Sequence, residues 1–326
     1  MAVQHENTEP LLVRHAANPI LTGRQWPYAV NSVFNAGAVR LPDGDTLLLC
    51  RVETRSGRSH LCAARSADGV SDWRIDSAPT LLPDLDHRPE ETWGIEDPRV
   101  VHLPEIDRYA VTYTCYSNRG PGVSLALTED FKSFERLGVV LPPENKNAAV
   151  LPRRIDGRWA MIHRPVSAAG GSHIWLARSP DLRHWGDHTR VLAARRGSWW
   201  DAPKIGLGPP LVETPQGRLM IYHGAHATVA GPIYRVGLAL LDPTNPAQCL
   251  LRSNEWILGP ESSAEQIGDV GNVVFPCGYT IGDDGDTLNL YYGAADTAVC
   301  LATGSIHGLL KWLRQHGDRP AADNEV

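Results

Sequence analysis

The 326-residue sequence contains no apolar run close to the roughly 20 residues that a membrane-spanning helix needs. Its start, MAVQHENTEPLLVRHAANPI, lacks the basic segment and apolar middle of a secretory signal peptide. The formal net charge is −6, so acidic residues outnumber basic ones. A protein that binds nucleic acid or an anionic membrane would instead be expected to have a basic face. We therefore expect a cytoplasmic protein that binds neither nucleic acid nor a membrane.

Several common catalytic motifs are missing. HExxH and G-x-S-x-G do not occur, and the segment GLGPPL has neither the GK[ST] nor the following helix of a phosphate-binding loop. No CxxC pair or His-rich zinc spacing is found, so we expect no metal and no organic cofactor. Buried free thiols in a reducing compartment are expected instead, because each cysteine lies in or beside an apolar run: Cys50, Cys62, Cys115, Cys249, Cys277 and Cys300.

Short strand-like runs fill most of the chain. TLLLCRV, YAVTYTCYS, WAMIHRP, RLMIYHG and LNLYYGAA are rich in β-branched or aromatic residues and are bounded by Gly, Pro, Asp or Asn. Helical periodicity is clear only in IHGLLKWLRQH, where Leu309, Leu310 and Leu313 share a face with Ile306. The pattern predicts an all-β protein with a short C-terminal helix. Its ten tryptophans mildly favour a carbohydrate site, since aromatic rings stack on sugar faces.

One supersecondary unit recurs along the chain. CAARSADGVSDW, SLALTEDFKSF and IWLARSPDLRHW each contain an apolar strand, a Ser or Thr, an Asp turn and an aromatic residue, and GLALLDPTNP and CLATGSIHGLLKW are looser copies. Their shared alanines are spaced 51 to 63 residues apart: Ala64, Ala126, Ala177, Ala239 and Ala302. Five repeats of about four strands predict a five-bladed β-propeller forming one domain over residues 1–326. Chance recurrence of such segments within a β-sandwich is the alternative.

The segment ETWGIEDPRV places two carboxylates, Glu96 and Asp97, just before an apolar strand. A carboxyl group buried at the mouth of a channel can have its pKa raised toward the working pH of a proton donor. An Asx turn before Pro98 explains the same residues equally well.

Cationic and amide side chains form a second pattern, because they end or open strands that otherwise look buried. Single buried cations usually pair with structural carboxylates, but several at the same end of different repeats would form an anion site. The residues concerned are Arg51, Lys146, Asn147, Arg164, Lys204 and His223. Two aspartates, Asp201 after two tryptophans and Asp296 in YYGAADT, could hold sugar hydroxyls or cap turns.

The order FNAGAV, LLLCRVETRSGRSHL, ETWGIEDPRV, KNAAVLP, MIHRP, APKIGLGPP, MIYHGA, YRVGLALLD, NVVFPCG and YYGAADT resembles glycoside hydrolase family 130. This family contains β-mannoside phosphorylases and related mannosidases, and the similarity runs from about Asn18 to about Trp312. The resemblance implies a five-bladed propeller and an inverting reaction. Oligosaccharide and inorganic phosphate would be the substrates, and α-mannose 1-phosphate would be the product.

The resemblance also implies roles for individual residues. Asp97 is the single essential acid, which donates its proton through a sugar hydroxyl. Phosphate is held by Arg164, Lys204, His223 and Tyr234, with Asn147 and Lys146 beside them, and mannose by Asn35, Arg51 and Asp296. A second carboxylate is unnecessary, because phosphate is already an anion and needs cations instead of a base.

Three points stay open. A β-mannosidase that uses water and a non-catalytic sugar-binding propeller are alternatives to a phosphorylase. The linkage and the acceptor sugar are not specified, since the leaving-group subsite is expected in variable loops around Ser167–Ser172 and Ala225–Pro232. Some relatives assemble into homo-oligomers through terminal extensions, so the oligomeric state is not specified either.

Overall fold

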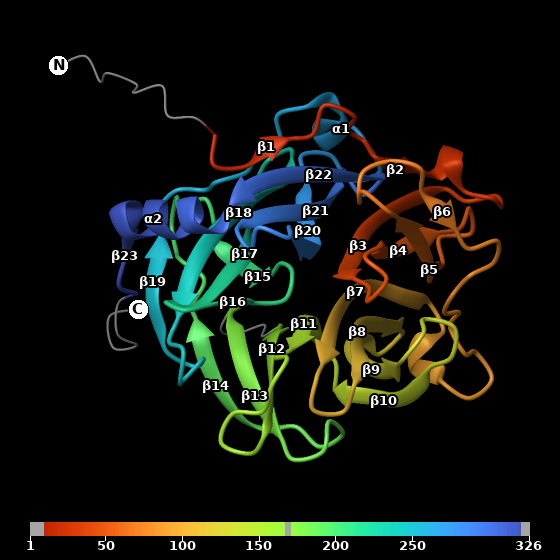
Figure 1. The fold of residues 1–326 in the computed structure, drawn as a ribbon, viewed down its shortest axis with the longest axis horizontal. Helices are drawn as coiled ribbons and strands as arrows, with labels where there is room; N and C mark the ends of the chain where they lie inside the picture. The colour runs from red at the N-terminus through yellow and green to blue at the C-terminus, as the bar shows by residue number, and fades with distance from the viewer. Residues whose placement is uncertain (1–9, 167–170, 321–326) are drawn as a thin grey trace.

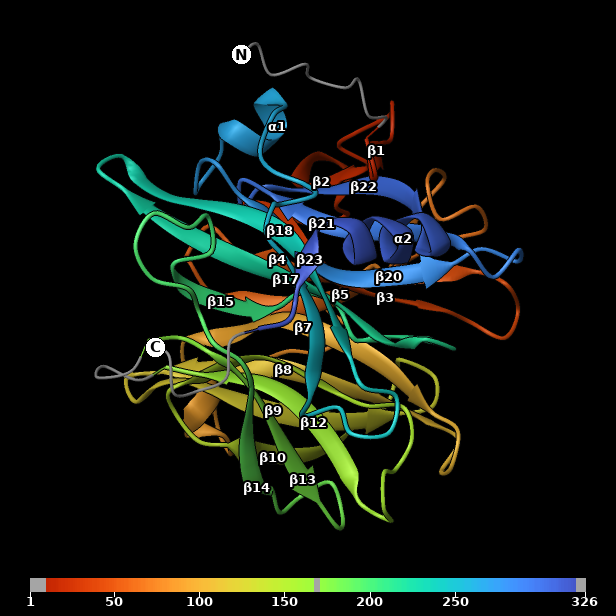
Figure 2. The same cartoon turned by 90° about the vertical axis from the view of Figure 1, so that its left-hand side faces the viewer.

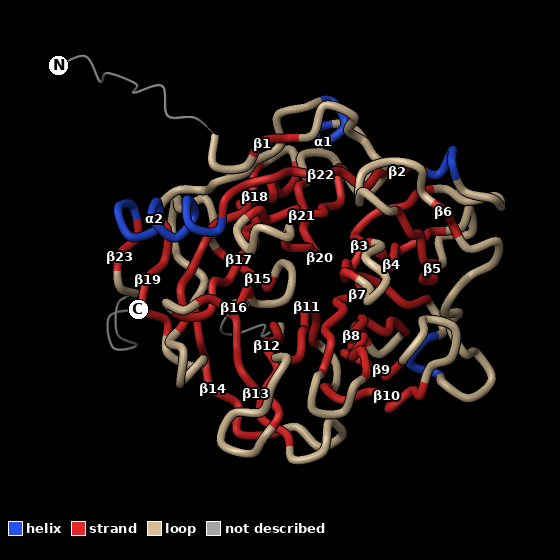
Figure 3. The backbone as a smooth tube through the Cα atoms, viewed as in Figure 1, coloured by secondary structure: helices blue, strands red, loops and turns tan. Residues whose placement is uncertain are grey.

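The computed structural model describes residues 10–166 and 171–320, and strands dominate it (Figures 1 and 3). The described strands form four hydrogen-bonded sheets, all built from antiparallel neighbours except at one bridge. That parallel bridge, Ser59 to Gly94, joins two four-stranded meanders into one eight-stranded sheet. The chain is thus organised as five successive meanders, which confirms the all-β prediction.

The meanders follow one another along the chain. The first contains β3 (Ser32–Arg40), β4 (Thr46–Glu53), β5 (Ser59–Ser66) and β6 (Arg74–Ile75), and the second β7 (Gly94–Leu103), β8 (Arg108–Ser117), β9 (Gly120–Thr128) and β10 (Glu135–Leu141). The third contains β11 (Asn145–Val150), β12 (Trp159–Pro165), β13 (Ile174–Ser179) and β14 (Gly186–Leu192). The fourth contains β15 (Pro203–Leu207), β17 (Gly217–Thr228), β18 (Gly231–Leu241) and β19 (Cys249–Ser253), with β16 (Val212–Thr214) beside β17 and β23 (Gly317–Asp318) beside β19.

The fifth meander is completed by the start of the chain. It contains β20 (Val274–Ile281), β21 (Thr287–Ala294) and β22 (Ala298–Ser305), and both β1 (Val13–Arg14) and β2 (Leu21–Thr22) pair with β22. Figure 1 shows the N-terminal red strands lying beside the C-terminal blue ones. The start of the chain is therefore held to the last meander by backbone hydrogen bonds between residues far apart in sequence.

The repeated unit detected in the sequence has a single structural position. The five marker alanines lie on β5, β9, β13, β18 and β22, the third strand of each meander, and all are fully buried: Ala64, Ala126, Ala177, Ala239 and Ala302. In four repeats the next turn is closed by an aspartate that accepts hydrogen bonds from the backbone N–H groups two and three residues later: Asp68, Asp130, Asp181 and Asp242. The fifth copy lacks this aspartate because its strand leads into a helix instead of a fourth strand.

Helical structure is short and lies at the edge of the molecule (Figures 2 and 3). The predicted C-terminal helix is α2 (Ile306–His316), and it buries Ile306, Leu309, Leu310 and Leu313 as the periodicity indicated. The Ser305 hydroxyl begins the helix by accepting a hydrogen bond from the Gly308 N–H. The other described helical turns are η1 (Gly23–Gln25), η2 (Pro89–Glu91) and α1 (Ser263–Gln266). Within the described residues no helix is long and apolar enough to cross a membrane.

The first strands of the meanders meet in the middle of the molecule. Strand β20 contacts β3, β3 contacts β7, β7 contacts β11, and β11 contacts β15. Figure 1 shows the five meanders arranged in sequence order around these strands.

All six cysteines are free thiols, and only Cys249 among them is not fully buried.

Candidate active site

Three inner strands carry the same irregularity at equivalent positions. In β3, β7 and β11 the pairing register shifts at Asn35, Asp97 and Asn147, respectively. Each of these residues has a left-handed backbone, with φ of 47°, 50° and 53°. Asn and Asp tolerate this conformation better than other side chains, and strain of this kind gathers at functional sites. The bulges bring three polar side chains from three meanders to one place.

These residues line a central cavity of about 220 Å³. Ten of its lining residues are the ones singled out from the sequence: Asn35, Arg51, Asp97, Lys146, Asn147, Arg164, Lys204, His223, Tyr234 and Asp296. The remainder are apolar: Pro232, Val270, Val273 and Phe275. Of the two loops expected to contribute a leaving-group subsite, the second reaches the cavity through Pro232, and residues 167–170 of the first lie outside the described residues.

Asp97 is held by two side chains from other strands. Its Oδ1 accepts a hydrogen bond from Asn35 Nδ2 at 2.9 Å and lies 3.2 Å from Arg51 Nη1. The carboxylate is only 6% exposed. Among the described residues, the Asp97 carboxylate makes these side-chain contacts and no hydrogen bond to the backbone that follows it. The Asx-turn interpretation therefore does not describe this residue.

The two aspartates of the cavity have opposite pKa shifts. Burial alone would raise the pKa of Asp97, but Arg51, Arg99 and Lys146 outweigh it and hold this pKa below its usual value. Burial, followed by the negative charge of Asp97, raises the pKa of Asp296 to about 6. In the absence of ligand, Asp97 is therefore an anion and Asp296 is the carboxyl group that protonates more readily.

Acidic groups gather on the Arg51 side of the cavity. The Arg51 guanidinium lies 3.2 Å from Glu96 Oε1 and 3.4 Å from Glu53 Oε2, in addition to its contact with Asp97. Lys146 Nζ pairs with Glu96 Oε2 at 3.2 Å. Arg51 and Lys146 thus each have a carboxylate partner, and carboxylate oxygens are suited to bind sugar hydroxyls.

Two further cations of the cavity, the buried Arg164 and the half-buried Lys204, make no ion pair with any described residue. Arg164 is 3% exposed, and within the described residues its guanidinium makes no hydrogen bond or ion pair; its buried Nε has no acceptor. Burial lowers its pKa to about 10. Among the described residues the Lys204 amine donates to Tyr234 Oη alone, at 3.0 Å, and burial together with Arg164 and Lys146 lowers the pKa of Lys204 to about 8. Two positive charges that make no ion pair with a carboxylate form a site for an anion.

His223 completes this side as a neutral donor or acceptor. It is fully buried, and burial, reinforced by Arg164 and Lys204, lowers its pKa well below the usual value. Its Nε2 lies 3.5 Å from Asn147 Nδ2. The space for both side chains depends on Gly206, where a Cβ atom would lie 2.5 Å from His223 Cε1 and 2.6 Å from Asn147 Nδ2.

Comparison with known proteins shows to which family the chain belongs. The family model of glycoside hydrolase family 130, described as β-1,4-mannooligosaccharide phosphorylase, matches residues 6–315. The chain belongs to glycoside hydrolase family 130. The resemblance found in the motifs is confirmed over nearly the whole sequence.

Characterised members of family 130 are similar over long segments. The β-1,4-mannooligosaccharide phosphorylase of Ruminococcus albus is 33% identical over 310 residues, which cover 93% of this chain and 91% of that protein. The β-1,2-mannobiose phosphorylase of Listeria innocua is 38% identical over 242 residues, covering 74% of this chain and 65% of that protein. The solved complex of the Listeria enzyme with β-1,2-mannobiose superposes with a TM-score of 0.84 at 30% identity, covering 94% of this chain and 99% of that one.

Asp201 does not lie with the other predicted residues of this family 130 chain. It is fully buried beneath the fourth meander, where it accepts hydrogen bonds from Tyr222 Oη at 2.8 Å and Arg252 Nη2 at 2.6 Å. It is absent from the lining of the central cavity. The expectation that Asp201 holds a sugar hydroxyl is therefore not kept, because the residue is fully buried outside the cavity and its Oδ2 belongs to a structural ion pair.

Arg99 is a site residue that the sequence reasoning overlooked. It is 1% exposed and donates from Nη1 to the Asp97 carbonyl at 2.8 Å and from Nε to the Gly208 carbonyl at 3.0 Å. It thus supports the left-handed backbone of Asp97 and contributes to the low pKa of its carboxyl group. Its place in the otherwise buried run EDPRV was the available signal, since an arginine is rarely buried without a partner.

Proposed function

We propose that the protein is an inverting phosphorylase that cleaves β-1,2- or β-1,4-linked manno-oligosaccharides, or a mannosyl-glucose type substrate, with inorganic phosphate. The product would be α-mannose 1-phosphate. Membership in family 130 and the phosphorylases to which the chain is similar support this function. We also propose that the five meanders are the blades of a single five-bladed propeller over residues 1–326, whose inner strands line the site.

The observation that carries the proposal is the charge distribution of the cavity. Arg164 is buried and Lys204 half-buried, and neither makes an ion pair with a described residue, whereas Asp97 lies between Asn35 and Arg51. A water-using enzyme has no need of uncompensated cations, and an inverting hydrolase requires a second carboxylate as base. A phosphate anion held by cations needs no such base.

The proposed roles follow this division. Phosphate would be held by Arg164, Lys204, His223, Tyr234, Asn147 and Lys146, and the mannose ring by Asn35, Arg51 and Asp296. A phosphate oxygen forms a bond to the anomeric carbon as the glycosidic bond on the opposite face breaks. Asp97 supplies the proton that the departing sugar oxygen takes up, relayed through a sugar hydroxyl as the family resemblance implies. Inversion converts the β-mannoside into the α-phosphate.

The proton on Asp97 depends on phosphate. In the unliganded cavity nearby cations lower the pKa of Asp97, so the group is ionised at neutral pH. A bound phosphate places negative charge beside Lys146 and Arg164 and offsets their field, which raises the pKa of the acid. Binding of phosphate would therefore favour the protonated form of Asp97, which is the form that donates the proton.

Reverse phosphorolysis tests the proposal directly. The purified protein receives α-mannose 1-phosphate with mannose, glucose, N-acetylglucosamine or mannobiose, and released phosphate is measured over time. Release with one acceptor is the expected result, and it also identifies the leaving-group sugar. Free mannose formed from β-mannosides without phosphate would instead identify a β-mannosidase, and binding without cleavage would identify a sugar-binding propeller.

A further inference from the structure

Glu96 is a buried carboxylate beside the active site to which the proposed reaction gives no role. It lies on β7, directly before Asp97 and the shift in pairing register. The residue is 8% exposed and is not among the residues that line the central cavity. A ligand in the cavity can therefore feel Glu96 only through its charge and through the side chains that Glu96 holds.

The two oxygens of Glu96 contact cations from two other meanders. Oε1 lies 3.2 Å from Arg51 Nη2 on β4, and Oε2 accepts a hydrogen bond from Lys146 Nζ on β11 at 3.2 Å. Both cations line the central cavity. Glu96 thus joins a residue that is proposed to hold mannose to one that is proposed to bind phosphate.

Arg51 does not depend on this contact for its position. Its Nε donates to Ser59 Oγ at 2.9 Å, and its Nη1 donates to Asp97 Oδ1 at 3.2 Å. Glu53 adds a carboxylate oxygen 3.4 Å from Nη2. Three partners would remain without Glu96, so we expect the guanidinium of Arg51 to keep its place.

Lys146 depends on Glu96 much more. Among the described residues its amine donates to Glu96 alone, and the centre of the Tyr116 ring lies 5.7 Å from Nζ. The Lys146 side chain is 28% exposed, so solvent or a ligand can reach it. A lysine ammonium is a point charge on a flexible stem, and it can turn its donors from one anion to another. The pair between Lys146 and Glu96 is therefore able to exchange.

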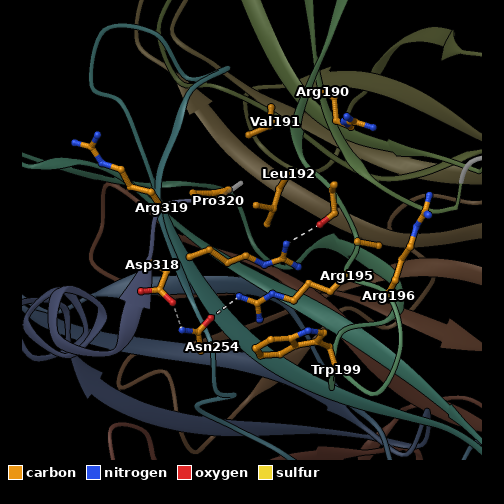
Figure 4. A pocket seen from close by; sticks show the side chains of 13 residues that line it. Arg190, Val191, Leu192, Arg195, Arg196, Trp199, Asn254, Asp318, Arg319 and Pro320 are labelled. Atoms are coloured by element: carbon orange, nitrogen blue, oxygen red, sulfur yellow. Dashed lines mark hydrogen bonds between the residues drawn. The ribbon is translucent and has the colours of Figure 1, made fainter. Parts of the chain in front are cut away.

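Arg195, in a second cavity of about 690 Å³ beside the fourth meander, shows the opposite case (Figure 4). It donates from Nη2 to Asn254 Oδ1 at 2.7 Å and lies 4.2 Å from the centre of the Trp199 ring. Its carboxylate partner at 3.7 Å, Asp201, is fully buried. Several partners thus fix this cation, and no ligand can replace its carboxylate, whereas Lys146 has one carboxylate partner at the edge of the site.

We propose that Glu96 is a positioning residue that holds Lys146 in the unliganded enzyme and releases it to incoming phosphate. The inference rests on the proposed function, because it assumes that phosphate enters the central cavity. Glu96 competes with phosphate for the Lys146 amine, so its negative charge weakens phosphate binding. After the exchange, Glu96 shares Arg51 with Asp97 and has one cation fewer, which favours the protonated form of Asp97.

The affinity for inorganic phosphate tests this role. Isothermal titration calorimetry compares the wild type with Glu96→Gln, which keeps the shape of the side chain but removes its charge. Release of Lys146 from a charged competitor should tighten phosphate binding about three- to tenfold. A purely structural Glu96 predicts the opposite sign, since its loss would disorder the site and weaken binding.

Glu53→Gln is the matched control. It removes a carboxylate from Arg51 but none from Lys146, whose amine donates to Glu96. We expect it to change the phosphate affinity less than about twofold. Phosphate binding by Glu96→Gln that is equal to or weaker than that of the wild type would overturn the proposal.

Phosphorolysis kinetics give a second readout. Glu96→Gln should lower the KM for phosphate and also lower kcat about tenfold, because loss of a neighbouring negative charge leaves Asp97 more strongly ionised. A rise in the KM for phosphate would contradict the proposed competition. Absence of phosphate binding and of phosphate-dependent cleavage in the wild type would instead contradict the proposed function, so the two failures are distinguishable.

Lys146→Met keeps the test decisive if Glu96→Gln does not fold. It removes the cation that is released and leaves the charge of Glu96 uncompensated near the site, so phosphate should bind at least about tenfold more weakly. An affinity equal to that of the wild type would show that Lys146 stays with Glu96 when phosphate binds, which would refute the proposed release.

Discussion

Replacement of Lys204 by methionine should make the protein more stable in phosphate-free buffer while abolishing phosphate-dependent cleavage. Burial and two neighbouring cations lower the pKa of Lys204 from 10.5 to about 8. At about 1.4 kcal/mol per pKa unit, the charged amine costs roughly 3 kcal/mol at neutral pH. Methionine retains the apolar stem but loses the hydrogen bond to Tyr234, worth about 1 kcal/mol. The expected net gain is about 2 kcal/mol in the free energy of unfolding.

Thermal unfolding measures this gain. With an unfolding entropy of about 2.1 cal/mol/K per residue, 2 kcal/mol in a chain of this length raises the Tm by roughly 3 °C. The native pKa lies below the unfolded one, so the cost of the charged lysine is fully present below pH 8 and disappears as pH rises toward 10.5. The difference between Lys204→Met and the wild type should shrink over the same range.

Phosphate reverses the order of stability. At about 100 times its dissociation constant, phosphate should stabilise the wild type by about 2.7 kcal/mol and leave Lys204→Met nearly unchanged. Lys132→Met, at an exposed position, is the matched control and should follow the wild type. The reasoning is refuted if Lys204→Met is less stable than the wild type without phosphate, or if phosphate raises the Tm of both equally.

Three further changes have defined outcomes. Asp97→Asn should lower kcat by about 10²- to 10⁴-fold, yet keep the phosphate-induced rise in Tm, because the acid is not a phosphate ligand; loss of that rise would contradict the assignment. Gly293→Ala should lower kcat about 100-fold, since its Cβ would collide with the amide that bonds the acid, whereas Gly186→Ala, with open space around it, should not. Leu313→Ala should cost about 3 kcal/mol by denaturant unfolding and Lys311→Ala almost nothing, because only the former is buried against the sheet; equal midpoints would argue against helix packing.

Local patterns in the sequence were sufficient for the all-β architecture, the repeat and the terminal helix. Short runs of β-branched and aromatic residues between turn residues predict strands, and the marker alanines fall on the third strand of every meander. The helix was predictable because Ile306, Leu309, Leu310 and Leu313 form a face at helical spacing. The motif set identified family 130, and ten of the residues chosen from it and from the charge pattern line one cavity.

Other properties depend on contacts between distant segments, which no local pattern contains. Asp201 and Asp296 were both candidates for a sugar contact, but only the tertiary structure pairs Asp201 with Arg252 and places Asp296 beside Asp97. The pKa values behave in the same way, because they depend on burial and on charges from other meanders. The joining of β1 and β2 to β22 likewise spans nearly the whole chain. The chemical groups and the strands that carry them can be read from the sequence, whereas the packing of the meanders decides which of these groups face the central cavity.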